Sequence, residues 1–127
     1  MNGKVLLFGF DELPAILAVE AAVSPFLAEV VPVARADYNK PLAALAGGDA
    51  RPAPALPYAG GPLGGRMVVL CGLDQQVSAM LPALAGAGAG PACLKAVLTE
   101  HNRDWDAVHL FAELTRERRA IQEQTAK

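Results

Sequence analysis

The apolar and polar positions of this chain alternate in a way that predicts strands and helices in turn. Short, wholly apolar runs at 5–8 and 67–70 are each followed closely by a glycine, which is typical of strands buried on both faces. Apolar residues at helical spacing follow each of these runs. The predicted strands cover 5–8, 30–34, 67–70 and 93–98, and the predicted helices cover 12–24, 40–46, 75–86 and 103–122.

Polar residues at the ends of these runs predict where helices begin. Asp11 and Asp74 each stand two residues after a glycine, so they are expected to cap the helices that follow the buried strands. Asn39 and Asn102 are expected to cap the helices that follow the second strand of each half. Pro32 cannot donate a ladder hydrogen bond, so its strand is placed at an edge of the sheet.

The two halves of the chain resemble each other. A shift of 63 residues without a gap places Gly9 on Gly72, and the same shift pairs the two helix-capping asparagines. The recurring positions fall at strand ends and helix starts, so we expect an internal duplication. Its halves are 4–46 and 67–122, joined by a linker at 47–65 that is rich in proline and glycine and expected to be mobile.

Two strand–helix–strand units joined in this way predict an α/β fold with a four-stranded sheet. The wholly apolar first strand of each unit belongs in the centre of the sheet and the second strand at an edge. A ferredoxin-like sheet in the order 4-1-3-2, with extra helices, has this arrangement. The alternative is a small doubly wound parallel sheet in the order 2-1-3-4, which has the same central strands.

Composition narrows the class of protein further. A chain of 127 residues predicts a single domain over 1–127, with enough apolar residues for a core. A net charge of −2 and a pI near 5.6 argue against a nucleic-acid partner, because phosphate binding needs a concentrated basic surface. The longest apolar region is interrupted by glutamate and proline, so no membrane span is expected. We expect a cytoplasmic protein in which Cys71 and Cys93 are buried free thiols.

The sequence offers few candidates for catalysis or metal binding. The Gly-x-Asp turns lack the glycine spacing of a dinucleotide site and the lysine of a phosphate-binding loop. Cys71, Cys93, His101 and His109 do not have the spacing of a metal site. No catalytic residue, metal ligand or cofactor is therefore predicted.

Polar residues gather in one stretch, LKAVLTEHNRDW, at 94–105. Asn102 recurs at the equivalent position of the first half, which favours a structural role. Residues found only in the second half are the better candidates for binding, although each also has a structural interpretation. Lys95 would protect an edge strand, Trp105 would anchor the last helix, and His101 would be a surface residue. The predicted binding site comprises Lys95, Thr99, His101, Asn102 and Trp105.

The segments LKAVLTEHNRDW, KVLLFGF, DYNKPL and MVVLCGL resemble a small bacterial family known only as a domain of unknown function (3783). This resemblance implies no activity, substrate or cofactor. From the residues themselves we expect a non-catalytic protein-interaction or regulatory module whose partner is a second copy or another protein. The alternatives are a small-molecule sensor and a hydrolase or transferase that uses His101.

Overall fold

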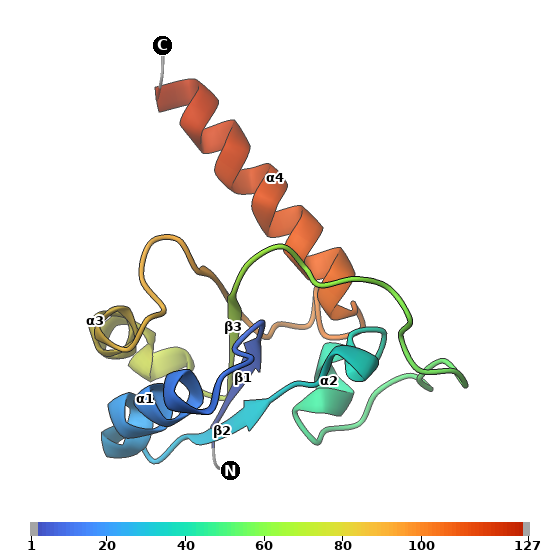
Figure 1. Cartoon of the computed structure of the whole chain (residues 1–127), viewed down its shortest axis with the longest axis horizontal. Coiled ribbons are helices and arrows are strands. Elements are labelled where there is room, and N and C mark those ends of the chain that lie inside the picture. Colours follow the sequence, from blue (N-terminus) through green and yellow to red (C-terminus); the bar gives the residue numbers. More distant parts are fainter. Residues whose placement is uncertain (1–2, 126–127) are drawn as a thin grey trace.

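A computed structural model describes residues 3–125 of the chain as a four-stranded sheet with helices on both faces (Figure 1). The strands are β1 (Lys4–Phe8), β2 (Glu29–Pro32), β3 (Met67–Cys71) and β4 (Leu94–Val97). The α-helices are α1 (Leu13–Val23), α2 (Leu42–Leu45), α3 (Val77–Gly86) and α4 (Ala107–Thr125). Short 3-10 helices cover Ser24–Phe26, Arg35–Asp37 and Asp74–Gln76.

The sheet confirms an α/β fold, but it differs from both predicted topologies. Its strand order is β2-β1-β3-β4, so the ferredoxin-like order 4-1-3-2 is wrong. The alternative gave the right order but the wrong directions. β1 pairs with β2 and β3 with β4 in parallel, whereas β1 and β3 run antiparallel. The sheet is therefore mixed, with one parallel strand–helix–strand unit on each side of an antiparallel centre.

The two central strands are related by an approximate twofold axis. Leu6 pairs with Val69 at the middle of the antiparallel ladder, and these residues are 63 positions apart. Rotation about that point exchanges Phe8 with Cys71, which are also 63 positions apart. The symmetry of the pairing thus agrees with the shift found in the sequence, while descent from a duplication stays a prediction.

The two halves are not superimposable without a gap beyond the central strands. Lys4 pairs with Glu29 in the first unit, whereas Met67 pairs with Leu94 in the second. The connection in the second unit is therefore two residues longer. In the sheet, Lys95 corresponds to the second residue of β2 and not to Pro32, with which the 63-residue shift aligned it.

Helices α1 and α3 pack against each other on one face of the sheet (Figure 1). Val19 and Val23 of α1, with Met80 and Leu84 of α3, cover the alternate strand residues that point to this face. The opposite face is covered by α2, by part of the linker and by the start of α4. This second core includes Phe8, Tyr38, Leu42, Met67, Cys71, Ala107 and Leu110.

The helix starts differ from those predicted. α4 begins at Ala107, and its first turn is capped by Asp106, whose Oδ1 accepts the His109 N–H at 2.8 Å. Neither Asn102 nor Asn39 caps a helix. α1 begins after Glu12, which makes no side-chain cap, so Asp11 does not cap that helix either. Asp74 begins a 3-10 turn before α3.

The linker has no regular secondary structure, as its proline and glycine content predicted, but it is tethered at several points. The Tyr58 N–H donates to the Ala36 carbonyl at 3.0 Å, and Arg51 Nε donates to the Asp104 carbonyl at 3.0 Å. The Tyr58 ring packs 5.7 Å from that of Tyr38. The sequence predicts a mobile linker in which Leu56 and Tyr58 are held to the surface, and these contacts of Tyr58 agree with the second part of that prediction.

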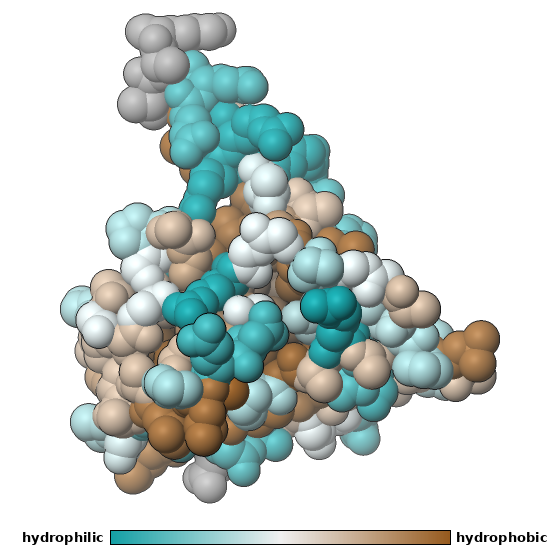
Figure 2. Space-filling view, viewed as in Figure 1, coloured by the Kyte–Doolittle hydropathy of each residue, from teal (hydrophilic) through white to brown (hydrophobic). Residues whose placement is uncertain are grey.

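Helix α4 is buried only at its beginning. Ala107 and Leu110 are buried, and Phe111 and Leu114 are half-buried. The helical spacing predicts Val108 in one buried stripe with Trp105 and Phe111, but Val108 is exposed. Beyond this part the helix extends away from the sheet, and its surface is hydrophilic (Figures 1 and 2). The sequence predicts that the charged end, TRERRAIQEQTAK, frays, whereas α4 continues to Thr125; residues 126–127 lie outside the described residues.

Candidate functional site

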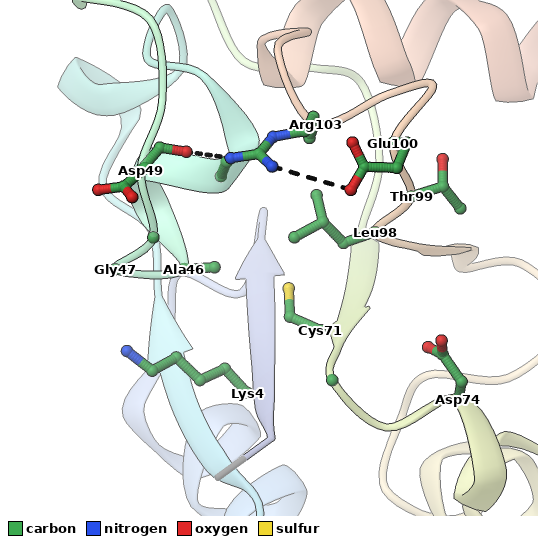
Figure 3. Close-up of a pocket in the computed structure, with 13 residues that line it drawn as sticks. Lys4, Ala46, Gly47, Asp49, Cys71, Asp74, Leu98, Thr99, Glu100 and Arg103 are labelled. Atoms are coloured by element: carbon green, nitrogen blue, oxygen red, sulfur yellow. Dashed lines mark hydrogen bonds and ion pairs between the residues drawn. The ribbon is translucent and has the colours of Figure 1, made fainter. Parts of the chain in front are cut away.

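A cavity of about 790 Å³ lies where β3 ends, between the two halves of the chain (Figure 3). Its volume falls in the range of small-molecule sites in proteins. Cys71 and Leu98 contribute apolar surface from the second half, and Ala43 and Ala46 contribute it from the first. The other lining residues are Lys4, Gly47, Gly48, Asp49, Gly72, Asp74, Thr99, Glu100 and Arg103.

Charged groups of both signs surround the mouth of the cavity. The Arg103 guanidinium donates to the backbone carbonyl of Asp49 and lies 3.9 Å from a carboxylate oxygen of Glu100 (Figure 3). Arg103 thereby holds the start of the linker against the segment that follows β4. The Lys4 ammonium lies 3.5 Å from the carboxylate of Glu29. Both cations are thus already paired, whereas no ion pair to Asp74 is found among the described residues.

The only thiol of the cavity belongs to Cys71, which is almost completely buried. Burial raises the pKa of this thiol to about 11, and the nearby Lys4 ammonium offsets only part of that effect. Because a thiolate is the nucleophilic form, Cys71 is protonated and unreactive near neutral pH. The side chain therefore supplies shape and apolar surface at this site.

Asn102 fixes the segment that carries Thr99 to the cavity. Its Oδ1 accepts the Thr99 N–H at 2.9 Å, and its Nδ2 donates to the Val97 carbonyl at 3.1 Å. The Asn102 N–H in turn donates to the Thr99 hydroxyl at 3.3 Å. With only 8% of its surface exposed, Asn102 is the sole buried polar residue in the described part of the chain. Its role in this structure is to shape a turn.

Replacement of Asn102 by alanine is expected to lower the free energy of unfolding by about 2–4 kcal/mol, because a buried amide and a carbonyl lose their partners. Asn39→Ala is the matched control. Asn39 donates only to the exposed Leu56 carbonyl, so its loss should cost under about 1 kcal/mol. Urea unfolding followed by circular dichroism measures both variants. Equal losses in the two variants would contradict this account of Asn102.

The structure does not bring the five predicted site residues together. Only Thr99 lines the cavity, and Asn102 stands behind it. Lys95 lies near the opposite end of β4, where its Nζ donates to the carbonyls of Gly90 at 2.7 Å and Cys93 at 3.1 Å. This placement agrees with the predicted protection of the sheet edge.

The remaining two predicted residues form an aromatic stack before α4. The Trp105 ring is stacked on that of His109, with centroids 4.1 Å apart, and meets the edge of His101 at 5.1 Å. Trp105 also packs partly against the second core, as its predicted anchoring role requires. Both histidines are exposed, and neither lines the cavity.

Sequence reasoning missed most of the residues that line the cavity. Lys4, Asp49 and Glu100 carried no recognisable motif. Asp74 was noticed only as a helix cap, and Arg103 only as the start of a helix. One signal in the sequence could have indicated the cavity. The Gly72-x-Asp74 turn follows β3, and it is expected to lie near the end of β4 because the carboxyl ends of neighbouring parallel strands meet at one edge of a sheet.

No group of three or more histidine, cysteine or acidic side chains within 3–125 is arranged to hold a metal ion. No helix in the same part of the chain is both long enough and apolar enough to cross a membrane.

The fold and the cavity define a mixed α/β protein with an open four-stranded sheet and a pocket between its halves. Residues 66–121 match a family described as a domain of unknown function (DUF3783). The resemblance predicted from the sequence is thereby confirmed for β3 to α4, while KVLLFGF and DYNKPL lie outside the match. No curated protein and no solved structure matches the chain.

Proposed function

We propose that this protein is a non-catalytic interaction module that self-associates through the outer surface of α1 and α3. The observation that carries the proposal is the apolar character of that surface. Leu13 and Leu17 of α1 are 64% and 51% exposed, and Leu81 of α3 is also exposed. Figure 2 shows hydrophobic surface over α1. A helix that is apolar on all sides is normally buried, so this pair lacks a cover.

The two helices contain almost no charged residues. Glu20 is the only charged residue of α1, and α3 has none. The exposed residues of the two helices are Leu13, Pro14, Leu17, Ala18, Glu20 and Ala21 in α1, and Ser78, Ala79, Leu81, Pro82, Ala85 and Gly86 in α3. Such a surface matches the fully buried centre of an interface, where charged residues are depleted.

The sheet edges are poorer candidates for association than these helices. β2 and β4 are only four residues long. Pro32 removes a donor from the β2 edge, and Lys95 folds over carbonyls at the start of β4. Short edges that carry proline and lysine are protected against strand addition. This favours the helical face over strand addition as the route to self-association.

A second copy of the chain is the partner that suits this surface. Apart from Glu20, an identical face places no charged residue against the two helices. The helices are also related by the approximate twofold of the sheet, so two such pairs can stack as a self-complementary layer. A cytoplasmic setting, in which Cys71 and Cys93 stay reduced, is part of the proposal.

Hydrogen-exchange mass spectrometry at several protein concentrations tests the location of the contact. Amides of α1 and α3 should gain protection as concentration rises, because association suppresses their local opening. Peptides from the exposed end of α4 serve as the internal control and should not change. Protection that rises instead in β2 or β4 would reject the helical face as the contact.

The cavity at the end of β3 favours a second candidate function, the binding of a small molecule. Its carrying observation is an apolar floor with polar groups at the mouth, which is the usual composition of such sites. The third interpretation, an enzyme that uses His101, gains no support, because His101 lies against Trp105 and away from the cavity.

A further inference from the structure

The cavity occupies a place that is filled in the other half of the molecule. Rotation about the centre of the β1–β3 ladder exchanges Cys71, which lines the cavity, with Phe8. Phe8 is fully buried, and its ring lies 6.0 Å from that of Tyr38. A small thiol therefore stands where the first half has a large ring. This substitution accounts for part of the open volume.

Tyr38 occupies the space in the first half that corresponds to the cavity in the second. Its pKa is raised by burial and by the nearby Asp11 carboxylate, and a backbone hydrogen bond to Gly9 offsets part of that rise. The phenol of Tyr38 thus lies against the turn that contains Gly9 and Asp11. The equivalent turn in the second half contains Gly72 and Asp74, which line the cavity.

The residue that would fill the cavity by symmetry is directed elsewhere. Because the second connection is two residues longer, the equivalent of Tyr38 is Arg103, 65 positions later, and its guanidinium is held by the Asp49 carbonyl and Glu100. The linker adds to the difference, because the Tyr58 ring packs 5.7 Å from that of Tyr38 in the first half.

We infer that the cavity binds a small phenolic compound, whose aromatic hydroxyl faces Asp74 and Gly72 as the Tyr38 hydroxyl faces Asp11 and Gly9. The ring would lie over Cys71 and between the apolar walls formed by Ala43, Ala46 and Leu98. The remaining volume leaves room for a larger substituent toward the mouth. This inference rests on the second candidate function, small-molecule binding.

The charges around the cavity favour a hydroxyl donor over an acidic ligand. Lys4 is paired with Glu29 and Arg103 with Glu100, so neither cation is held free for a carboxylate. Asp74 lies at the edge of the cavity (Figure 3) and accepts hydrogen bonds through its carboxylate. A hydroxyl that donates to a carboxylate makes a charge-assisted hydrogen bond, which is stronger than a neutral one.

Binding of phenol and of anisole, measured by ligand-observed NMR titration of the full chain, tests the inference. Anisole has the same ring but no hydroxyl donor. Phenol should bind about tenfold more tightly than anisole, and Asp74→Ala should remove that preference. Asp11→Ala is the matched control, because Asp11 occupies the equivalent turn beside the filled space. It should leave the preference unchanged.

Cys71→Phe restores the residue found on the symmetric strand and should reduce phenol affinity by about tenfold or more, because the ring enters the cavity. Circular dichroism establishes whether that variant folds. Should it fail to fold, amide chemical shifts of the wild-type protein replace it. Phenol at saturating concentration should shift the Gly72 and Asp74 amides, with those of Gly9 and Asp11 as the internal reference.

The outcomes separate the two proposals. Binding of neither compound to the wild type would overturn both small-molecule binding and the phenolic ligand. Equal binding of phenol and anisole, unchanged by Asp74→Ala, would overturn the phenolic ligand and leave small-molecule binding standing. Phenol binding that survives Cys71→Phe, or that leaves the Gly72 and Asp74 amide shifts unchanged, would place the ligand outside the cavity and overturn both.

Discussion

Leu17→Glu is expected to convert the self-associated protein into a monomer. Leu17 is 51% exposed on α1 and lies within the apolar surface that we propose as the contact. In a twofold interface the change introduces one buried carboxylate from each copy. At about 2 kcal/mol for each, the dissociation constant should rise on the order of 1,000-fold. Analytical ultracentrifugation over a range of concentrations measures this change.

Leu56→Glu is the matched control for that experiment. Leu56 is 78% exposed, but it lies in the linker and away from α1 and α3. The Leu56→Glu substitution makes the same chemical change on a surface outside the proposed contact. The mass of this variant should therefore equal that of the wild type at every concentration. Dissociation by Leu56→Glu with no effect of Leu17→Glu would place the contact on the linker.

Gly9→Ala is expected to be strongly destabilising. Gly9 has φ of +81°, and an added Cβ would stand 2.7 Å from the Gly65 carbonyl oxygen. That oxygen is backbone, so it cannot turn aside as a flexible side chain would. The positive φ costs about 1–2 kcal/mol and the clash adds to it, so we expect a total loss of about 3 kcal/mol or more.

Comparison with Gly72→Ala separates the loss of stability caused by the positive φ from the loss caused by the steric clash. Gly72 has φ of +70°, and the nearest atom to an added Cβ is the Gly3 Cα at 3.7 Å. Only the conformational cost of about 1–2 kcal/mol applies there. Urea unfolding of both variants should show Gly9→Ala to be clearly the less stable. Equal losses would mean that Gly65 does not cover the first turn as tightly as the structure has it.

The sequence was sufficient to predict the strands, because fully buried strands require uninterrupted apolar residues. It also predicted that the first strand of each unit is central and that Pro32 marks an edge. The direction of β3 relative to β1 was not predictable in this way. That direction depends on the route of the linker, and its glycines and prolines permit either orientation.

The helix starts and the candidate site were harder to predict than the strands. Asn102 is followed by an arginine, as Asn39 is by a lysine, so both looked like helix caps. The first turn of α4 instead takes its cap from Asp106. The cavity is left open because Cys71 is smaller than Phe8 and because Arg103, the equivalent of Tyr38, is directed to the Asp49 carbonyl. A space that no side chain fills can be found only when the two halves are compared in three dimensions.

The central claim is that α1 and α3 carry a self-association surface, and the mass of the wild-type protein in solution tests it most directly. Size-exclusion chromatography with light scattering at high concentration should give about twice the chain mass of 13.2 kDa. The mass should fall toward that of one chain on dilution. A mass of one chain at every concentration would contradict the account.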